Sequence, residues 1–208
     1  RDSSGGGGVI GPGDVQWMTA GGGIVHEEFH SEAFSRRGGE LEMVQLWVNL
    51  PARYKMTPAR YQALRDADIP TLALPAGAGW LRLIAGEYAG TSGAAETHSP
   101  VDVWDLRLNA GGRAKLPAAE GRNLIVVVLQ GTVQINDETV LRDAQMAVLD
   151  PKGEDFTVEA NGDAKLLVLG GEPLDQPVVG HGPFVMTSQA EIREAINDFT
   201  SGRFGRTA

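Results

Sequence analysis

Short apolar runs, most of them bounded by glycine or other turn residues, recur along the whole chain and predict β-strands. The strongest runs are 43–50, 71–74, 80–85, 101–108 and 124–130. Other runs predict further strands at 9–10, 15–19, 24–29, 132–135, 144–149, 156–159 and 165–169. Many short strands separated by turns are typical of a β-sandwich or β-barrel, so we expect an all-β protein.

Four segments depart from this pattern. Residues 30–40 are polar and predict a loop, and residues 58–65 predict a short helical connector. Asn161-Gly162 predicts a hairpin because both residues tolerate positive φ. Ser188 and Glu191 form a capping box in front of a helical apolar stripe, and Gly202 can end that helix in a left-handed conformation. We therefore expect a short C-terminal helix over 188–201.

Composition narrows the class of protein. Of the 208 residues, 42% are hydrophobic and 22% are charged, as in ordinary globular proteins. The formal net charge of −9 disfavours direct binding to nucleic acid, because such a surface repels phosphates. The chain has no cysteine, and no apolar run approaches the roughly 20 residues that cross a bilayer. We expect no membrane association, a monomer, and a cytoplasmic location, or a nuclear one in a eukaryote.

Candidate chemistry follows three consecutive glycines, at His26, Glu27 and Glu28. If 24–29 is a strand, its side chains alternate, so His26 and Glu28 share one side and Glu27 lies on the other. An imidazole and a carboxylate together suit a first-row metal such as iron or manganese. The glycines would leave room above the strand. The alternative interpretation is an exposed or salt-bridged strand face.

Four motifs in order resemble the pirin family of two-cupin proteins. They are Asp14-Val-Gln-Trp-Met-Thr-Ala, Gly23-Ile-Val-His-x-Glu28, Gln45-Leu-Trp-Val-Asn-Leu-Pro51 and Gly182-Pro-Phe-Val-Met186. The resemblance runs from Arg1 to about Arg206. It implies a bicupin built from double-stranded β-helices, with residues 1–66 as the C-terminal part of a metal-binding cupin. Residues 67–208 would form a second cupin without a metal site, plus the C-terminal helix.

The resemblance also implies a ligand set. Pirins hold one iron with three histidines and one glutamate in their first cupin, and His26 and Glu28 match the last two of these ligands. The first two belong to a His-Pro-His-Arg-Gly motif, whereas this chain contains no His-x-His. We therefore expect two further histidine ligands upstream of Arg1, a first cupin that is incomplete, and a chain truncated relative to the family. The implied cofactor is Fe(II) or another divalent first-row metal.

Other residues are assigned simpler roles. Residues 117–123 stand where a second cupin would carry its histidines, and their sequence predicts a second cupin without metal. We interpret His30 as a loop or pocket-rim residue and His98 and His181 as structural or exposed. The four tryptophans, Trp17, Trp47, Trp80 and Trp104, are expected in the core or in pocket walls. Trp17 and Gln45 are candidates to line the metal pocket.

The function implied by the resemblance is oxidative ring opening of a flavonol such as quercetin. In that reaction Glu28 would serve as the general base that takes the proton of a substrate hydroxyl. The alternative is a non-enzymatic, iron-dependent regulator, such as a transcription coregulator or redox sensor, that binds a protein partner. Family membership does not decide between them, because one fold hosts many functions.

Overall fold

The computed structural model describes residues 1–206 and divides the chain into two compact units. One unit joins residues 1–63 to the segment that starts at Asp175, and the other runs from Leu64 to Leu174. The sequence predicted a boundary near residue 67 and placed everything after it in one domain. The C-terminal segment instead groups with the N-terminal one. Within that unit Lys55 donates to the Val185 carbonyl and Ser3 to the Phe204 carbonyl.

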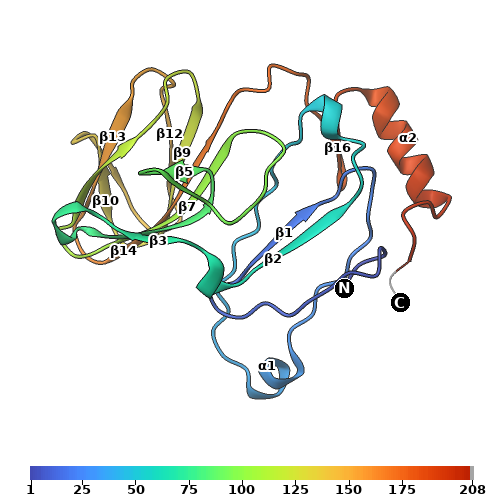
Figure 1. Ribbon diagram of the computed structural model, residues 1–208, viewed down its shortest axis with the longest axis horizontal. Coiled ribbons are helices and arrows are strands. Elements are labelled where there is room, and N and C mark those ends of the chain that lie inside the picture. Colours follow the sequence, from blue (N-terminus) through green and yellow to red (C-terminus); the bar gives the residue numbers. More distant parts are fainter. Residues whose placement is uncertain (207–208) are drawn as a thin grey trace. The chain divides into compact units, whose positions relative to one another are not determined.

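The Leu64–Leu174 unit contains two antiparallel sheets (Figure 1). The six-stranded sheet has the order β12 (Met146–Leu149), β9 (Asn123–Gln130), β14 (Ala164–Gly171), β7 (Val101–Leu108), β4 (Gly79–Ala85) and β3 (Thr71–Ala73). The four-stranded sheet has the order β11 (Thr139–Leu141), β10 (Val133–Ile135), β13 (Asp155–Ala160) and β8 (Arg113–Pro117). The unit also contains a small hairpin of β5 (Glu87–Tyr88) and β6 (Thr91–Ser92), and 3₁₀ turns at Asp66–Asp68 and Pro75–Gly77.

Strand alternation explains how this unit forms its core. Along β9 every second residue is buried, namely Leu124, Val126 and Val128, and β13 repeats the pattern with Phe156 and Val158. These side chains belong to one apolar cluster that includes residues of both sheets. Two sheets facing each other across a shared core form the sandwich expected of a cupin, and the predicted all-β class is confirmed.

The turn at Asn161-Gly162 does not close a hairpin. It follows β13, which pairs with β8 and β10, and precedes β14, which pairs with β7 and β9. The two strands therefore lie in different sheets. Neither turn residue adopts positive φ, so the conformation that favours a two-residue hairpin is absent there.

The other unit has less regular structure. It contains the paired strands β1 (Val15–Thr19) and β2 (Arg60–Leu64), the helix α1 (Glu32–Arg37), a 3₁₀ turn at Ala52–Tyr54, the hairpin of β15 (Val179–His181) and β16 (Phe184–Met186), and the helix α2 (Gln189–Thr200). Five predictions are wrong here. Residues 9–10, 24–29 and 43–50 form no strand. The predicted loop at 30–40 contains the helix α1, and the predicted helical connector at 58–65 contains the strand β2, whose backbone pairs with β1.

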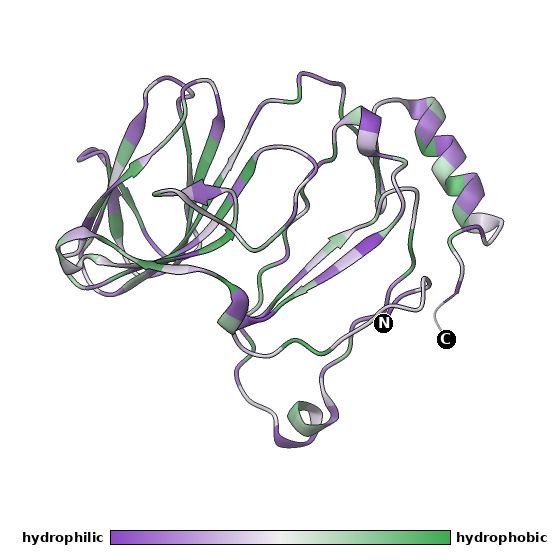
Figure 2. Cartoon of the chain, viewed as in Figure 1, coloured by the Kyte–Doolittle hydropathy of each residue, from purple (hydrophilic) through white to green (hydrophobic). Residues whose placement is uncertain are grey.

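Helix α2 begins as the sequence predicted. Ser188 Oγ accepts from the Glu191 amide, and the Glu191 carboxylate accepts from the amides of Thr187 and Ser188, which completes the capping box. Figure 2 shows that polar and apolar residues alternate around this helix. Its Phe199 packs edge-on against Phe184 and lies beside Phe204. No helix within residues 1–206 has both the length and the apolar content needed to span a bilayer.

Candidate metal centre

The glycine triplet before His26 lets the backbone pass close to two neighbours. Gly21 and Gly23 have φ of 53° and 123°, and the Gly22 amide donates to the Thr57 carbonyl at 2.9 Å. A Cβ atom on Gly21 would lie 2.0 Å from that carbonyl oxygen, and one on Gly23 would lie 2.2 Å from the Phe204 ring. The predicted room above a strand is therefore wrong, because the space beside Gly21 and Gly23 is filled by Thr57 and Phe204.

His26 is held by the first residues of the chain. An isolated antiparallel bridge pairs it with Asp2, and the flanking hydrogen bonds run from the Ser3 amide to Val25 at 2.8 Å and from the Glu27 amide to Arg1 at 2.9 Å. Ser3 Oγ also accepts from the Val25 amide at 3.0 Å. One bridge, rather than a full strand, thus fixes the backbone at His26.

Asp2 supports this bridge from the other side. Its carboxylate accepts from the Ser4 hydroxyl at 2.6 Å and from the amides of Ser4 and Gly6. The Ser4 hydroxyl, together with these amides, holds the pKa of the Asp2 carboxyl below its usual range. The sequence analysis did not assign Asp2 a role, although an aspartate ahead of Ser-Ser-Gly is a recognisable turn signal. Asp2 is therefore a turn-forming residue.

The two predicted ligand side chains lie next to each other. His26 Nδ1 is 3.7 Å from Glu28 Oε1, and the side chains are 34% and 50% exposed. Glu27 turns to a different partner, Arg1, whose Nε lies 3.2 Å from its carboxylate. The structure thus brings His26 and Glu28 together and separates Glu27 from them, although the segment is not a strand.

The pair has the chemistry and the spacing to share one ion. Two ligand atoms that are each about 2.1 Å from a metal can be at most about 4.2 Å apart, and 3.7 Å falls within that limit. Within residues 1–206, however, no group of three or more histidine, cysteine, aspartate or glutamate side chains could hold a metal ion. The described residues therefore do not form a complete metal centre. The ligand roles of His26 and Glu28 stay predictions.

The remaining candidates lie elsewhere. His30 is exposed and stacks on Phe34, with ring centroids 5.3 Å apart. His181 is exposed on β15, and His98 is half-buried. Of the two residues considered as pocket lining, Trp17 is half-buried on β1 and Gln45 is exposed. Trp104 is buried as expected, whereas Trp47 is 66% exposed and lines no core.

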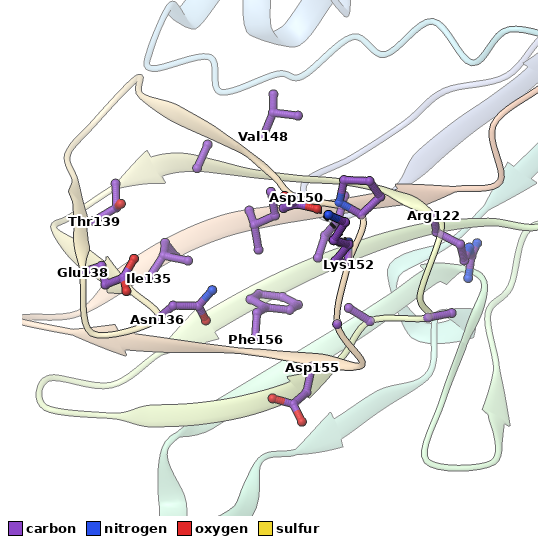
Figure 3. A pocket seen from close by; sticks show the side chains of 17 residues that line it. Arg122, Ile135, Asn136, Glu138, Thr139, Val148, Asp150, Lys152, Asp155 and Phe156 are labelled. Atoms are coloured by element: carbon purple, nitrogen blue, oxygen red, sulfur yellow. Dashed lines mark hydrogen bonds between the residues drawn. The ribbon is translucent and has the colours of Figure 1, made fainter.

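In the Leu64–Leu174 unit, residues 117–123 border a hollow of about 280 Å³ (Figure 3). Ala118, Ala119 and Arg122 line it from this segment, in place of the histidines of a metal-binding cupin. Figure 3 shows Arg122 toward one end of the hollow and Ile135 and Glu138 toward the other, with Phe156, Asp150 and Lys152 between them. That this unit binds no metal stays a prediction.

Comparison with known proteins identifies the family. The model of the pirin C-terminal cupin domain matches residues 103–205, and the pirin model matches residues 1–48. The chain is 58% identical over 206 residues to the Pseudomonas aeruginosa protein named "Putative quercetin 2,3-dioxygenase PA2418", covering 99% of this chain and 72% of that protein. The chain belongs to the pirin family.

Two further relatives of this pirin are informative. Human pirin is 35% identical over 205 residues, covering 95% of this chain and 67% of the human protein. The crystal structure of quercetin 2,3-dioxygenase from Acinetobacter baumannii superimposes with a TM-score of 0.95 at 55% identity, covering 99% of this chain and 71% of that chain. The cupin fold predicted from the sequence is thus confirmed. The match at residues 1–48 does not support the predicted N-terminal truncation.

Proposed function

We propose that this pirin acts as a metal-dependent dioxygenase that opens the ring of a flavonol such as quercetin. The observation that carries the proposal is the His26–Glu28 pair, 3.7 Å apart in a chain that is 58% identical to a protein named as a quercetin dioxygenase. In this proposal His26 and Glu28 supply two ligands to a divalent first-row metal, Fe(II) in the first instance, and other donors complete the shell.

Glu28 has a second role in the proposed reaction. Its side chain is 50% exposed, so a substrate hydroxyl can reach the carboxylate directly. A carboxylate in that position can accept the hydroxyl proton as a general base. The His26 imidazole lies beside this carboxylate, with Nδ1 3.7 Å from Glu28 Oε1, so one metal ion could contact both.

The test uses protein expressed from its complete coding sequence. We expect His26→Ala and Glu28→Ala each to lower the affinity for Fe(II) at least about tenfold, because each removes one ligand atom. Quercetin consumption with oxygen uptake should stop on chelation. His30→Ala is the matched control, because His30 lies in the same segment but stacks on Phe34. Unchanged metal affinity in either ligand variant would refute the assignment.

One observation favours a second function, the binding of a protein partner. Residues 41–48 expose several large apolar side chains, among them Leu41 at 58%, Met43 at 62% and Trp47 at 66%. Large clusters of exposed apolar side chains often mark a surface that binds another protein. An iron-dependent regulator would show partner binding that differs between the Fe(II) and Fe(III) forms, with no flavonol turnover in either form.

A further inference from the structure

The chain contains a single Asn-Gly sequence, Asn161-Gly162, in the connection that carries β13 of the four-stranded sheet to β14 of the six-stranded sheet. Hydrogen bonds fix the residues on either side of it. The Ala160 amide donates to the Gly112 carbonyl at 2.9 Å, and Asp163 Oδ1 accepts from the Ala110 amide at 2.9 Å. The connection is therefore anchored at both of its ends.

Between these anchors, two groups that can react with each other lack hydrogen-bond partners. Asn161 is exposed, and its backbone amide donates to the Thr132 carbonyl at 3.0 Å. Its side-chain amide has no partner within residues 1–206, and the Gly162 amide donates to no acceptor in the same part of the chain. The side-chain carbon of Asn161 and the peptide nitrogen of Gly162 are therefore held by neither a donor nor an acceptor.

The space around Gly162 is open. A Cβ atom at this position would meet no heavy atom within 4 Å beyond its chain neighbours, and φ here is not positive. Gly131 in the same unit differs, because its φ is 97° and a Cβ atom on it would lie 2.7 Å from the Asp163 carbonyl oxygen. Neither packing nor backbone conformation requires the glycine at 162. Its missing side chain leaves the peptide nitrogen accessible and the backbone around it freer to move.

We propose that Asn161 is a site of spontaneous deamidation in the folded protein. The Gly162 nitrogen loses its proton to hydroxide and attacks Cγ of Asn161, an intramolecular step between adjacent groups. The side-chain amide nitrogen takes a proton from water and leaves as ammonia, and a five-membered succinimide remains. Water then adds to either succinimide carbonyl and opens the ring to aspartate or isoaspartate. The net reaction converts one amide and one water into one carboxylic acid and one ammonia.

The products alter the connection between the two sheets. Either product adds a negative charge to a turn that already contains Asp163. The isoaspartate product also adds a methylene to the backbone between β13 and β14, whose flanking residues are fixed by the hydrogen bonds described above. The reaction needs only water and is independent of the proposed metal centre.

The test is mass spectrometry of the full chain, incubated folded at neutral and mildly alkaline pH in ¹⁸O-labelled water and digested at acidic pH. We expect the peptide that contains Asn161 to incorporate ¹⁸O as its amide becomes an acid, and the rate to rise with pH because hydroxide removes the Gly162 proton. A protein isoaspartate methyltransferase should label the product. Gly162→Ala should slow the conversion several-fold while the melting temperature does not fall, because the new Cβ meets open space at a compatible φ.

Asn136 is the internal control. It is also exposed in the same unit, but its Oδ1 accepts from the Thr157 amide at 2.9 Å and the next residue is Asp137. It should convert several-fold more slowly than Asn161. The same incubation in urea gives the rate of the unfolded chain, and we expect the folded chain to react at a comparable rate. The proposal is overturned if Asn161 converts only in urea, if Asn136 converts as fast, or if Gly162→Ala leaves the rate unchanged.

Discussion

A buried charge cluster in the Leu64–Leu174 unit makes the strongest prediction about stability. Asp105 and Arg82 are 5% and 8% exposed, and Arg82 Nη1 donates to Asp105 Oδ2 at 3.1 Å. Arg107 adds a second donor at 3.0 Å to the same oxygen. Arg82 also reaches Asp66, 2.6 Å away, whose side chain is 60% exposed. Asp105 is therefore the buried anion that two arginines share.

We expect Asp105→Asn to destabilise the protein strongly although it preserves the shape of the side chain. Removing one partner of a buried ion pair leaves a desolvated charge and costs roughly 3–5 kcal/mol. Because Arg82 retains Asp66, the lower end of that range applies, about 3 kcal/mol. For a chain of this size, that loss lowers the melting temperature by roughly 6–12 °C.

Thermal and urea unfolding, followed by circular dichroism, would measure the effect. Asp155→Asn is the matched control, because Asp155 forms a cross-strand pair with Lys115 in which both side chains are well exposed. Exposed pairs contribute at most about 1 kcal/mol. The reasoning fails if Asp105→Asn is no more destabilising than Asp155→Asn, since burial would then not determine the cost.

Two further predictions concern the other unit. Lys55 is buried, and its Nζ donates to Asn49 Oδ1 at 2.7 Å and to the Val185 carbonyl at 3.0 Å. Lys55→Met leaves both acceptors without this donor and should lower the free energy of unfolding in urea by about 1–3 kcal/mol. A decrease smaller than the error of that measurement would contradict the prediction. Hydrogen bonds from Thr187 and Ser188, of which the Thr187 hydroxyl has the largest effect, lower the pKa of the Glu191 carboxyl. The carboxylate's contribution to α2 is therefore full above the ordinary pKa of 4.5 and is lost as pH falls through the lower folded value. Hydrogen exchange of the α2 amides should show protection falling on acidification below that point, and Glu191→Gln should abolish the pH dependence; an unchanged profile would refute the assignment.

The sandwich was predictable because its local pattern and its long-range packing agree. Val101–Leu108 was predicted as a strand with the bounds it has in the structure, and the strand predicted at 124–130 differs from β9 by one residue. In both strands alternate residues enter one apolar core, and along β9 that periodicity alone marks the buried side. The sequence could not predict how the two strands beside the turn at 161–162 pair, because a turn sequence does not reveal which sheet each flanking strand joins.

The unit around His26 shows where periodicity fails. Residues 43–50 carry the β-branched and aromatic residues typical of a strand, yet no strand forms and Trp47 is 66% exposed. Strand propensity measures how well a side chain fits a pleated, half-buried surface, and the described residues provide no partner strand for this segment. Conversely, Arg60–Leu64 became a strand because β1 pairs with it, which no local signal indicated.

The sequence correctly predicted that His26 and Glu28 lie together, but it assumed a strand that the structure does not contain. Alternation along a strand would place the two side chains on one side, but the segment makes a single bridge to Asp2. Glu27 contacts Arg1 instead of joining the pair. The backbone that leads to His26 packs closely at Gly21 and Gly23 against Thr57 and Phe204. The position of the pair therefore depends on contacts with residues distant in sequence. A Cβ atom on Gly23 would collide with the Phe204 ring, so we expect Gly23→Ala to displace His26 and to weaken Fe(II) binding at the proposed site, measured by titration, without altering a proposed ligand.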